Sequence, residues 1–369
     1  MLQLQGNIKN KLSHNQNIIE IVNTVINTAL NLKSSDIHFL PSTAETVIIQ
    51  FRIDSITHNI YTMPGELYTK VQIHLKVLAK LDINLTQIPQ DGRFSLKHDG
   101  QTIDCRINLC PTIFGQKIVI RLINNNIILN VLGLGMQQSQ LLAINNALAK
   151  NSGLILITGP TGSGKTVTLY SILKELRDKN LSIMATCDPV EITLEGISQT
   201  SLCDTNKLDA PQIIRAFLRQ DPDVIMIGEI RDSCTLKAAL QAATTGHLVI
   251  ASMHSNNALH TLTRIEHLGF NKHEFIDLLN IVIVQRLVRK ICNICYNKKK
   301  CNHCINGLRG VIGVYEILQL GHQNVSDILN NNLKNIKISP TLAGSAKRLE
   351  QLNITTKSEA QRALGGDYY

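Results

Sequence analysis

Apolar side chains recur along the first third of the chain with two different periods. In residues 17–32 they fall at positions 18, 19, 22, 25, 26, 29 and 30, the spacing of one face of a helix. A second helix-like segment covers residues 68–83. Short strand-like runs surround it, at 47–54, 91–96, 103–109 and 116–123. Helices mixed with strands that are adjacent in sequence predict a small α+β domain over residues 1–123.

Beyond residue 136 helical and strand-like segments alternate, which is the pattern of a mostly parallel sheet. A helix is predicted at roughly 273–290, and residues 322–364 are polar with weak helical periodicity. Asparagines at 124–126 and glycines at 133 and 135 indicate a linker over 124–135. The chain is therefore expected to be an α/β protein whose second domain spans 136–369. The strands predicted for its sheet are 154–158, 181–186, 223–228 and 248–253.

Composition narrows the class of protein. A chain of 369 residues suits two domains, and Lys plus Arg exceeds Asp plus Glu by 37 − 28 = 9. That excess suits nucleotides, anionic lipid surfaces or nucleic acid, but aromatic residues are only 4% and Trp is absent, which argues against a base-stacking platform. No run of about 18 apolar residues is present, and the N-terminal stretch lacks the apolar core of a secretory signal. Neither a transmembrane segment nor a signal peptide is predicted.

A phosphate-binding motif follows the first strand of the second domain. The sequence GPTGSGKT satisfies G-x-x-x-x-G-K-[ST], with an apolar strand before it and a helix-like segment after it. Its backbone N–H groups are expected to converge on phosphate oxygens. Lys165 is expected to contact the β- and γ-phosphates, and the Thr166 hydroxyl to ligate Mg²⁺. The alternative is a Gly-rich turn without a ligand. The predicted nucleotide-binding residues are Gly159, Pro160, Thr161, Gly162, Ser163, Gly164, Lys165 and Thr166.

Ionisable residues follow the other predicted strands, where ligands of parallel α/β sheets bind. Asp188 and Glu191 come after one strand, Glu229 after the next and His254 after the last. Glu229 is the candidate for organising Mg²⁺ or the attacking water, and the alternative is a helix-capping acid. His254 is either a γ-phosphate sensor or an ordinary satisfied polar residue. Asp221-Pro-Asp223 lies at the opposite strand end and is predicted to be a turn.

Two CxxC pairs near the C-terminal end predict a metal site. Cys292, Cys295, Cys301 and Cys304 supply four thiolates at a spacing that suits a closed tetrahedral Zn²⁺ site, with three lysines at 298–300 between the pairs. His303 is a substitute ligand, and four unliganded thiols are the alternative. The other five of the nine cysteines are scattered, so a reducing, cytosolic compartment is expected. They are Cys105, Cys110, Cys187, Cys203 and Cys234.

These residues resemble one family, the ATPases of type II secretion and type IV pilus assembly. SSDIHFLP at 34–41 resembles the opening of the family's N-terminal domain, and GLILITGPTGSGKTVTLYSIL resembles its Walker A segment. DPVEITLEGISQT resembles the aspartate box, FLRQDPDVIMIGEIRD the Walker B region and TTGHLVIASMHSNNAL the histidine box. The four-cysteine module is similar to that of the assembly and secretion members and is absent from the retraction ATPases. The resemblance runs from about residue 34 to the end of the four-cysteine module, and continues weakly beyond it.

The resemblance implies a RecA-like P-loop domain in a homo-oligomer, usually a hexamer, that hydrolyses ATP with Mg²⁺. It also implies a peripheral position at the cytoplasmic face of the inner membrane, where a platform protein is the partner and pilin-like subunits are assembled or extruded. Candidate arginines on the N-terminal strands would approach the nucleotide phosphates, partly across subunits, although such arginines are often surface charges. These are Arg52, Arg93, Arg106 and Arg121.

The sequence departs from the family pattern at several places. Cys187 stands where the family has Glu, Asn257 where Asp is expected, and Gln50 where Arg is often found. The additional N-terminal domain of many members is expected to be missing, which leaves the docking to the membrane machinery open. Because a thiol accepts hydrogen bonds poorly, a nucleotide-binding scaffold with impaired hydrolysis is one rival hypothesis. A nucleic-acid-binding motor is the other, although no nucleic-acid partner is expected.

Overall fold

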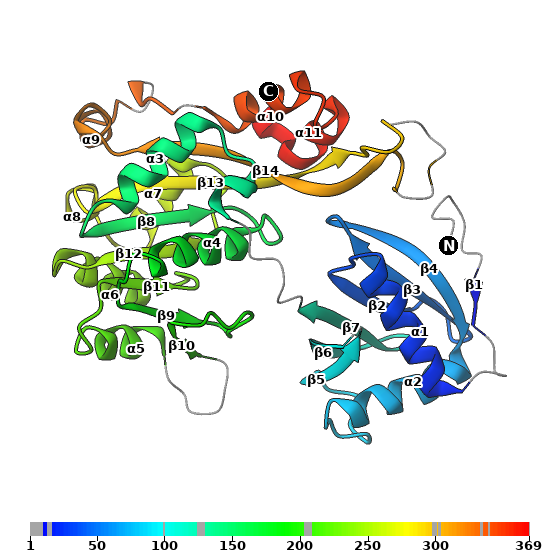
Figure 1. Ribbon diagram of the computed structural model, residues 1–369. Helices are drawn as coiled ribbons and strands as arrows, with labels where there is room; N and C mark the ends of the chain where they lie inside the picture. Colours follow the sequence, from blue (N-terminus) through cyan, green and yellow to red (C-terminus); the bar gives the residue numbers. More distant parts are fainter. Residues whose placement is uncertain are drawn as a thin grey trace. The chain divides into compact units, whose positions relative to one another are not determined.

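The structure is a computed structural model that describes residues 10–12, 17–98, 100–123, 130–202, 209–296, 301, 304–332, 335–338 and 340–368. The chain forms two compact units (Figure 1). The first comprises Met1–Asn126 with Cys292–Arg309, and the second comprises Ile127–Ile291 with Gly310–Tyr369. The asparagines of the predicted linker lie outside the described residues, and a 3-10 helix η1 (Val131–Leu134) forms within its second half.

The first unit is a sheet with two helices on one face. Helix α1 (Ile18–Asn31) forms where it was predicted, and Asn17 caps it by accepting a hydrogen bond from the Ile19 N–H at 3.0 Å. Helix α2 (Gly65–Leu78) begins earlier and ends earlier than predicted. In the described residues the sheet order is β1-β4-β3-β2-β7-β6-β5. The strands are β1 (Asn10–Lys11), β2 (Asp36–Pro41), β3 (Thr46–Ile53), β4 (Ile56–Pro64), β5 (Gln90–His98), β6 (Gln101–Thr112) and β7 (Gly115–Ile123).

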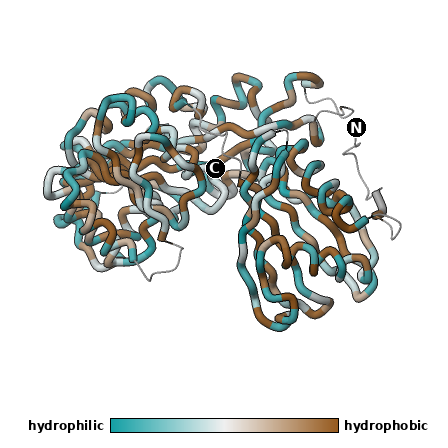
Figure 2. The backbone as a smooth tube through the Cα atoms, turned by 60° about the horizontal axis from the view of Figure 1, so that its bottom comes forward, coloured by the Kyte–Doolittle hydropathy of each residue, from teal (hydrophilic) through white to brown (hydrophobic). Residues whose placement is uncertain are grey.

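The strands of this sheet alternate between a buried and a more polar face. In β3 every second residue is buried, and apolar and polar segments alternate along these strands in Figure 2. The buried side chains of the sheet, such as Phe39 and Phe51, pack in one core with Val25 of α1 and Val71 of α2. The four predicted strand runs lie in β3, β5, β6 and β7, while β2 and β4 were not predicted.

The second unit is a mainly parallel sheet covered by helices on both faces, so the expected α/β fold is confirmed. All four predicted strands form, and strands buried on both faces read as continuous apolar runs. The order is β10-β9-β11-β12-β8-β13-β14, and β10, β9, β11, β12, β8 and β13 are paired in parallel. The strands are β8 (Gly153–Thr158), β9 (Ile183–Cys187), β10 (Ser198–Ser201), β11 (Val224–Ile227), β12 (Leu248–Met253), β13 (Leu279–Ile291) and β14 (Leu308–Gln319).

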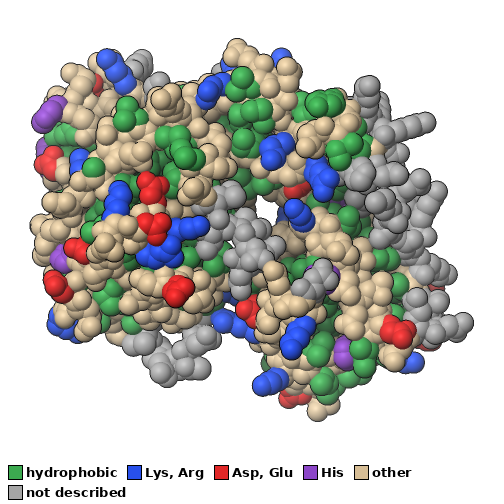
Figure 3. Space-filling view, viewed as in Figure 1, with side chains coloured by type: hydrophobic (Ala, Val, Ile, Leu, Met, Phe, Trp, Pro, Cys, Tyr) green, Lys and Arg blue, Asp and Glu red, His purple; other side chains and the backbone are tan. Residues whose placement is uncertain are grey.

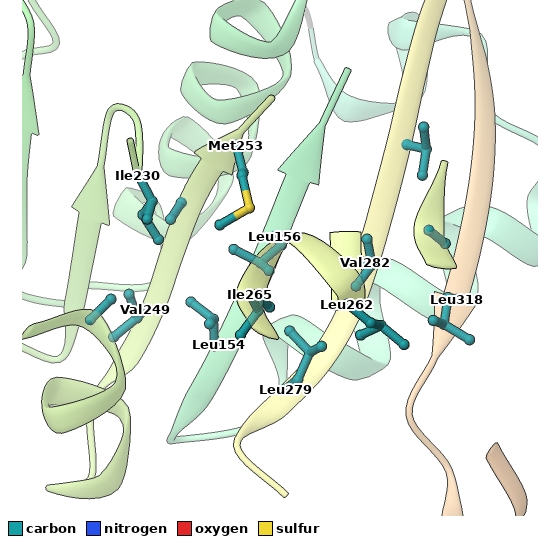
Figure 4. Packing of buried hydrophobic residues seen from close by; sticks show 14 of the residues in the cluster. Leu154, Leu156, Ile230, Val249, Met253, Leu262, Ile265, Leu279, Val282 and Leu318 are labelled. Atoms are coloured by element: carbon teal, nitrogen blue, oxygen red, sulfur yellow. The ribbon is translucent and has the colours of Figure 1, made fainter. Parts of the chain in front are cut away.

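Two hydrophobic clusters fill the spaces between this sheet and its helices. One cluster joins the sheet to α3 (Gln138–Leu148) and α4 (Lys165–Arg177). The other joins it to α5 (Ala210–Phe217), α6 (Ser233–Thr244) and α7 (Ala258–His267). Leu154 and Leu156 of β8 lie with Leu262 and Ile265 of α7 in the second cluster (Figure 4). The segment predicted to be weakly helical forms α9 (His322–Leu329), α10 (Leu342–Gln351) and α11 (Lys357–Leu364), followed by η3 (Gly365–Tyr368).

The prediction of a helix at 273–290 is wrong. Only the short helix α8 (Lys272–Phe275) forms there, and the following residues are strand β13. Its Ile281 and Ile283 pack in the cluster with α3 and α4, whereas Val282 and Val284 pack in the opposite one. A strand buried on both faces loses its alternation of apolar and polar residues, so periodicity alone does not separate it from a helix.

Candidate functional site

The carboxyl ends of four neighbouring parallel strands meet at one edge of the second sheet. The phosphate loop follows β8, Asp188 follows β9, Glu229 follows β11 and His254 follows β12. Adjacent parallel strands bring their carboxyl ends to the same edge, where ligands of open α/β sheets bind. The residues singled out by the strand-end argument therefore lie side by side in the folded unit.

The phosphate loop has the backbone geometry that its glycines allow. Gly162 and Gly164 have φ of 78° and 87°, the left-handed region, and helix α4 begins directly after Gly164. A side-chain carbon on Gly159 would lie 2.5 Å from the carbonyl oxygen of Gln285. The hydroxyl of Ser163 is buried and has no hydrogen-bond partner among the described residues. A helix N-terminus preceded by a tight loop with an unpaired donor fits the binding of an anion.

The side chain of Lys165 folds back onto the phosphate loop. Its ammonium donates hydrogen bonds to the carbonyl oxygens of Gly159 at 2.8 Å and Pro160 at 3.0 Å. Burial lowers the pKa of Lys165, the charge of Glu229 opposes that shift, and the charge of Arg286 adds to it. The charge of Glu229, at the end of β11, thus acts on the lysine.

Glu229 is held on both of its carboxylate oxygens. His254 Nε2 lies 3.1 Å from Oε1, and Arg231 donates to Oε2 at 2.9 Å. The other guanidinium nitrogen of Arg231 donates to Asp188 Oδ2, also at 2.9 Å. Asp188, Arg231, Glu229 and His254 thus form a continuous polar chain across three strand ends. Acidic and basic side chains lie next to one another on the face of this unit seen in Figure 3.

Other residues near the site have different surroundings. Helix α6 is capped by Asp232, which accepts a hydrogen bond from the Thr235 N–H at 2.8 Å, so Glu229 is not the helix-capping acid of the alternative interpretation. Asp223 Oδ2 accepts a hydrogen bond from the Ser182 N–H at 2.7 Å, at the opposite end of β11. Asp221 has a φ of 50°, which is turn geometry.

Two predicted residues stand apart from the polar chain. Thr166 is the second residue of α4 and is exposed. Glu191 has no side-chain hydrogen bond or ion pair with Asp188 or Glu229 in the described structure, and its charge acts on Tyr170 and Cys187. Cys187 is only 4% exposed in the core next to α4, with its sulfur 3.5 Å from the Tyr170 hydroxyl, and burial raises the pKa of this thiol.

The four candidate arginines lie in one row across the sheet of the first unit. Cross-strand pairing aligns Arg93 with Arg106, Arg106 with Arg121, Arg121 with Asp36, and Asp36 with Arg52. Asp36 is buried and forms ion pairs with Arg121 at 3.0 Å and Arg52 at 3.6 Å. Nε and one terminal nitrogen of Arg106 are buried without a hydrogen-bond partner in the described part of the chain. The row combines four cations with one carboxylate.

The neighbouring strand β13 contributes two residues that sequence reasoning missed. Gln285 packs against both ends of the phosphate loop, and its Oε1 accepts a hydrogen bond from the Thr168 hydroxyl at 2.8 Å. Arg286 is 6% exposed and lies close enough to lower the pKa of Lys165. The wrong helix at 273–290 concealed them, although the β-branched run IVIV before Gln285 is a strand signal that was available in the sequence.

The four cysteines come together between β13 and β14. Their sulfurs all lie within 4.8 Å of one another, and those of Cys295 and Cys304 are 3.5 Å apart. Tetrahedral Zn–S bonds place sulfurs about 3.8 Å apart, so the donor set fits a closed zinc site. Burial works against ionisation of Cys292, but hydrogen bonds from the Cys295 and Ile294 N–H groups outweigh it and lower the pKa of that thiol to about 7. His303 and the lysines at 298–300 lie outside the described residues.

Several curated proteins are similar to this chain. It is 36% identical over 361 residues to the type IV pilus assembly ATPase PilB of Acinetobacter baylyi, covering 90% of the chain and 62% of the relative. Identity is 39% over 351 residues to the protein transport protein HofB homolog of Haemophilus influenzae, covering 94% and 73%. It is 35% over 360 residues to the type II secretion system protein E of Pectobacterium carotovorum, covering 90% and 72%. The chain thus spans less than two thirds of the length of this PilB.

Solved structures of two other proteins share the fold. The ATPase DotB of Legionella pneumophila has a TM-score of 0.77 at 20% identity, covering 97% of this chain and 99% of DotB. The pilus retraction motor PilT, solved with bound ADP, has a TM-score of 0.65 at 25% identity, covering 94% and 96%. The helices of the described residues include none that is long and apolar enough to cross a membrane.

A family model described as "Type II/IV secretion system protein" matches residues 11–362, which is nearly the whole chain. The match includes the phosphate loop, the polar chain at the strand ends and the four cysteines, and it agrees with the resemblance that the motifs indicate. The chain therefore belongs to the type II/IV secretion system protein family.

Proposed function

We propose that the chain is an ATP-hydrolysing motor that powers pilus or pseudopilus assembly, or type II protein secretion. The observation that carries this proposal is the edge of the second sheet, where a phosphate loop ends β8 and the carboxylates of Asp188 and Glu229 follow two neighbouring strands. The names of the relatives, a pilus assembly ATPase and a type II secretion protein, agree with it, as does the ADP bound to PilT.

In this proposal the residues of the phosphate loop hold the β- and γ-phosphates. Lys165 turns its ammonium from the loop carbonyl oxygens to the phosphates, and the buried hydroxyl of Ser163 supplies a donor. Thr166, exposed on the first turn of α4, offers its hydroxyl to Mg²⁺. When bound, Mg²⁺ neutralises charge on the phosphate oxygens. The loop thereby supplies positioning and electrostatic stabilisation, which dominate catalysis of phosphoryl transfer.

In this proposal Glu229 orients the attacking water molecule. His254 and Arg231 fix its carboxylate from two sides, so the carboxylate has one preferred direction. Asp188 shares the same arginine and adds negative charge where a metal ion and its waters would lie. Glu191 has a supporting electrostatic role, because its charge acts on Tyr170 and Cys187, which adjoins Asp188.

The arginine row of the first unit suits phosphate contacts. Arg52, Arg93, Arg106 and Arg121 lie in one cross-strand row with Asp36, which pairs with Arg52 and Arg121. Arg106 has two buried nitrogens without hydrogen-bond partners in the described structure. Buried guanidinium nitrogens such as these two of Arg106 suit an anionic ligand. We propose that a homo-oligomeric ring, a hexamer, brings such arginines to the nucleotide of a neighbouring subunit.

The cysteine cluster is proposed to hold Zn²⁺ as a scaffold, with all four ligand positions occupied by protein sulfur. A closed site stabilises the loop between β13 and β14 and leaves no coordination position for a substrate. We place the motor peripherally at the cytoplasmic face of the inner membrane, with a platform protein of the secretion or pilus machinery as its partner. No nucleic-acid partner is part of the proposal.

The rival hypothesis of a nucleotide-binding scaffold with impaired hydrolysis depends on Cys187. Its sulfur lies in the hydrophobic core beside Tyr170, whereas the polar chain is complete without any group from position 187. The absence of a carboxylate at this position removes no contact of Glu229 or His254. This arrangement favours hydrolysis over the scaffold.

Steady-state ATPase assays with Mg²⁺ test the proposal. Glu229→Gln is expected to lower kcat by about 10²-fold or more, the range for loss of a group that acts in the transition state, with nucleotide binding retained. Glu195→Gln, at an exposed carboxylate of the same unit, is the control and should turn over like wild type. Wild-type turnover no higher than that of Glu229→Gln would contradict the motor and leave the scaffold.

A further inference from the structure

A buried arginine lies beside the phosphate loop, and the roles proposed above do not use it. Arg286 lies in β13, two residues after Val284, whose pair with Thr158 ends the alignment with β8. Its side chain is 8% exposed. A buried guanidinium must be paired and hydrogen-bonded to remain charged, so its partners have structural consequences.

The partners of Arg286 come from three separate segments. One terminal nitrogen donates to the carbonyl oxygen of Gln285 at 3.2 Å. The other donates to the carbonyl oxygen of Asn256 at 2.8 Å and lies 3.3 Å from Asp367 Oδ2. Asn256 lies two residues after His254, in the loop that leads into α7. One side chain therefore ties the C-terminal 3-10 helix to the loop that carries His254.

The same arginine is connected to the phosphate loop through its neighbour. The carbonyl oxygen of Gln285, which accepts a hydrogen bond from Arg286, is also the atom that a side-chain carbon on Gly159 would approach within 2.5 Å. The Gln285 amide group lies against Gly164 in the same way. A shift of Arg286 would therefore act on both sides of the site, at the start of the phosphate loop and at the His254 loop.

Asp367 is fixed in place by the packing of its own segment. The next residue, Tyr368, is 5% exposed, and its hydroxyl donates to Glu350 Oε2 at 3.3 Å. Lys347 lies over the Tyr368 ring, with its ammonium 5.6 Å from the centroid. The Asp367 carboxylate is the acidic group in ion-pair contact with Arg286, and Glu316 acts on the same guanidinium electrostatically from β14.

We propose that Asp367 is a positioning residue of the nucleotide site. By holding Arg286, it fixes the loop from His254 to Asn257 against the phosphate loop, so that His254 keeps its contact with Glu229. The inference rests on the proposed function for its effect on hydrolysis, but the restraint on the loop stands on the contacts alone. It predicts that loss of the Asp367 carboxylate slows turnover and leaves nucleotide binding by the phosphate loop intact.

The test uses the complete 369-residue chain and two readouts. Asp367→Asn should lower kcat about 3- to 10-fold, in the lower part of the range that interaction energies between contacting residues give, with KM for ATP within about twofold. Hydrogen exchange of amides in residues 254–260 should become several-fold faster. Asp367→Glu should recover part of both effects. Asp178→Asn is the matched control, because it removes the carboxylate of an Arg–Asp pair at 2.8 Å on the exposed end of α4.

A double-mutant cycle shows whether Asp367 acts through Arg286. Arg286→Lys keeps a positive charge but loses the planar donor arrangement, and adding Asp367→Asn to it should change kcat less than twofold further. Full additivity of the two changes would overturn the proposal, as would unchanged exchange in 254–260 or a rise in KM at constant kcat. If Asp367→Asn does not fold, Asp367→Ser, which also removes the carboxylate, takes its place, and wild-type exchange in 254–260 then overturns the proposal. Wild type without turnover refutes the motor, while the exchange experiment still decides the role of Asp367.

Discussion

Glu316 offers the sharpest test of how the second unit holds its site. This carboxylate lies on β14 and is 6% exposed. Oε1 accepts a hydrogen bond from the Ala258 N–H at 2.9 Å, and Oε2 accepts one from the Leu342 N–H at 3.3 Å. Ala258 and Leu342 are the first residues of α7 and α10. A single buried carboxylate thus accepts a hydrogen bond from the first N–H group of each of two helices.

The change Glu316→Gln keeps the shape of the side chain and removes one acceptor and the charge. One buried helix N–H then faces an amide donor, which costs about 1–3 kcal/mol as an unsatisfied group. Loss of the negative charge near two helix N-termini adds about 0.3–1 kcal/mol for each helix. We expect the free energy of unfolding to fall by about 2–4 kcal/mol. For a domain of about 150–250 residues, this lowers Tm by roughly 5–15 °C.

Thermal and urea unfolding followed by circular dichroism measure this loss. Glu266→Gln on α7, whose carboxylate lies 3.8 Å from the Lys272 ammonium at the surface, is the control and should change stability by less than about 0.5 kcal/mol. ATPase activity should fall as well, because α7 begins directly after the His254 loop. A Glu316→Gln protein as stable as the control would show that the two hydrogen bonds contribute nothing, and the reasoning would be refuted.

Three further predictions concern acid stability, the phosphate loop and the metal. Burial alone would raise the pKa of Glu359, but hydrogen bonds from Arg362 and Arg289 outweigh it and lower that pKa to about 2. The resulting stability, about 3 kcal/mol, is present above pH 4.5 and is lost as the pH falls towards 2, so Glu359→Gln should remove this one contribution and make the unfolding free energy fall less steeply between these pH values. Gly159→Ala should abolish nucleotide binding measured by calorimetry, because the new carbon would approach the Gln285 oxygen to 2.5 Å, whereas Gly321→Ala, in open space at a φ of -86°, should bind normally. Wild type should contain one zinc per chain by elemental analysis and Cys295→Ser much less, while Cys110→Ser should match wild type, and a metal-free wild type would exclude the site.

The sequence by itself determined the features that depend on local patterns. The GPTGSGKT motif between an apolar strand and a helix located the phosphate loop, and the two CxxC pairs located the cysteine cluster. The strand predictions for β8, β9, β11 and β12 were correct. Short hydrophobic runs bounded by polar residues have few structural alternatives to a buried strand in an α/β protein. The sequence also predicted that Asp188, Glu229 and His254 lie close together, because parallel strands end at a common edge.

Only the tertiary structure decided which groups these residues contact. Arg231 joins Asp188 to Glu229, although 43 residues separate the arginine from the aspartate in sequence. Strand β13 was mistaken for a helix because burial on both faces erases the alternation that identifies a strand, and with it Gln285 and Arg286 were missed. The contact of Arg286 with Asp367, 81 residues away, has no local signature. Such pairs are set by strand order and by the packing of the C-terminal helices, which no local pattern of residues records.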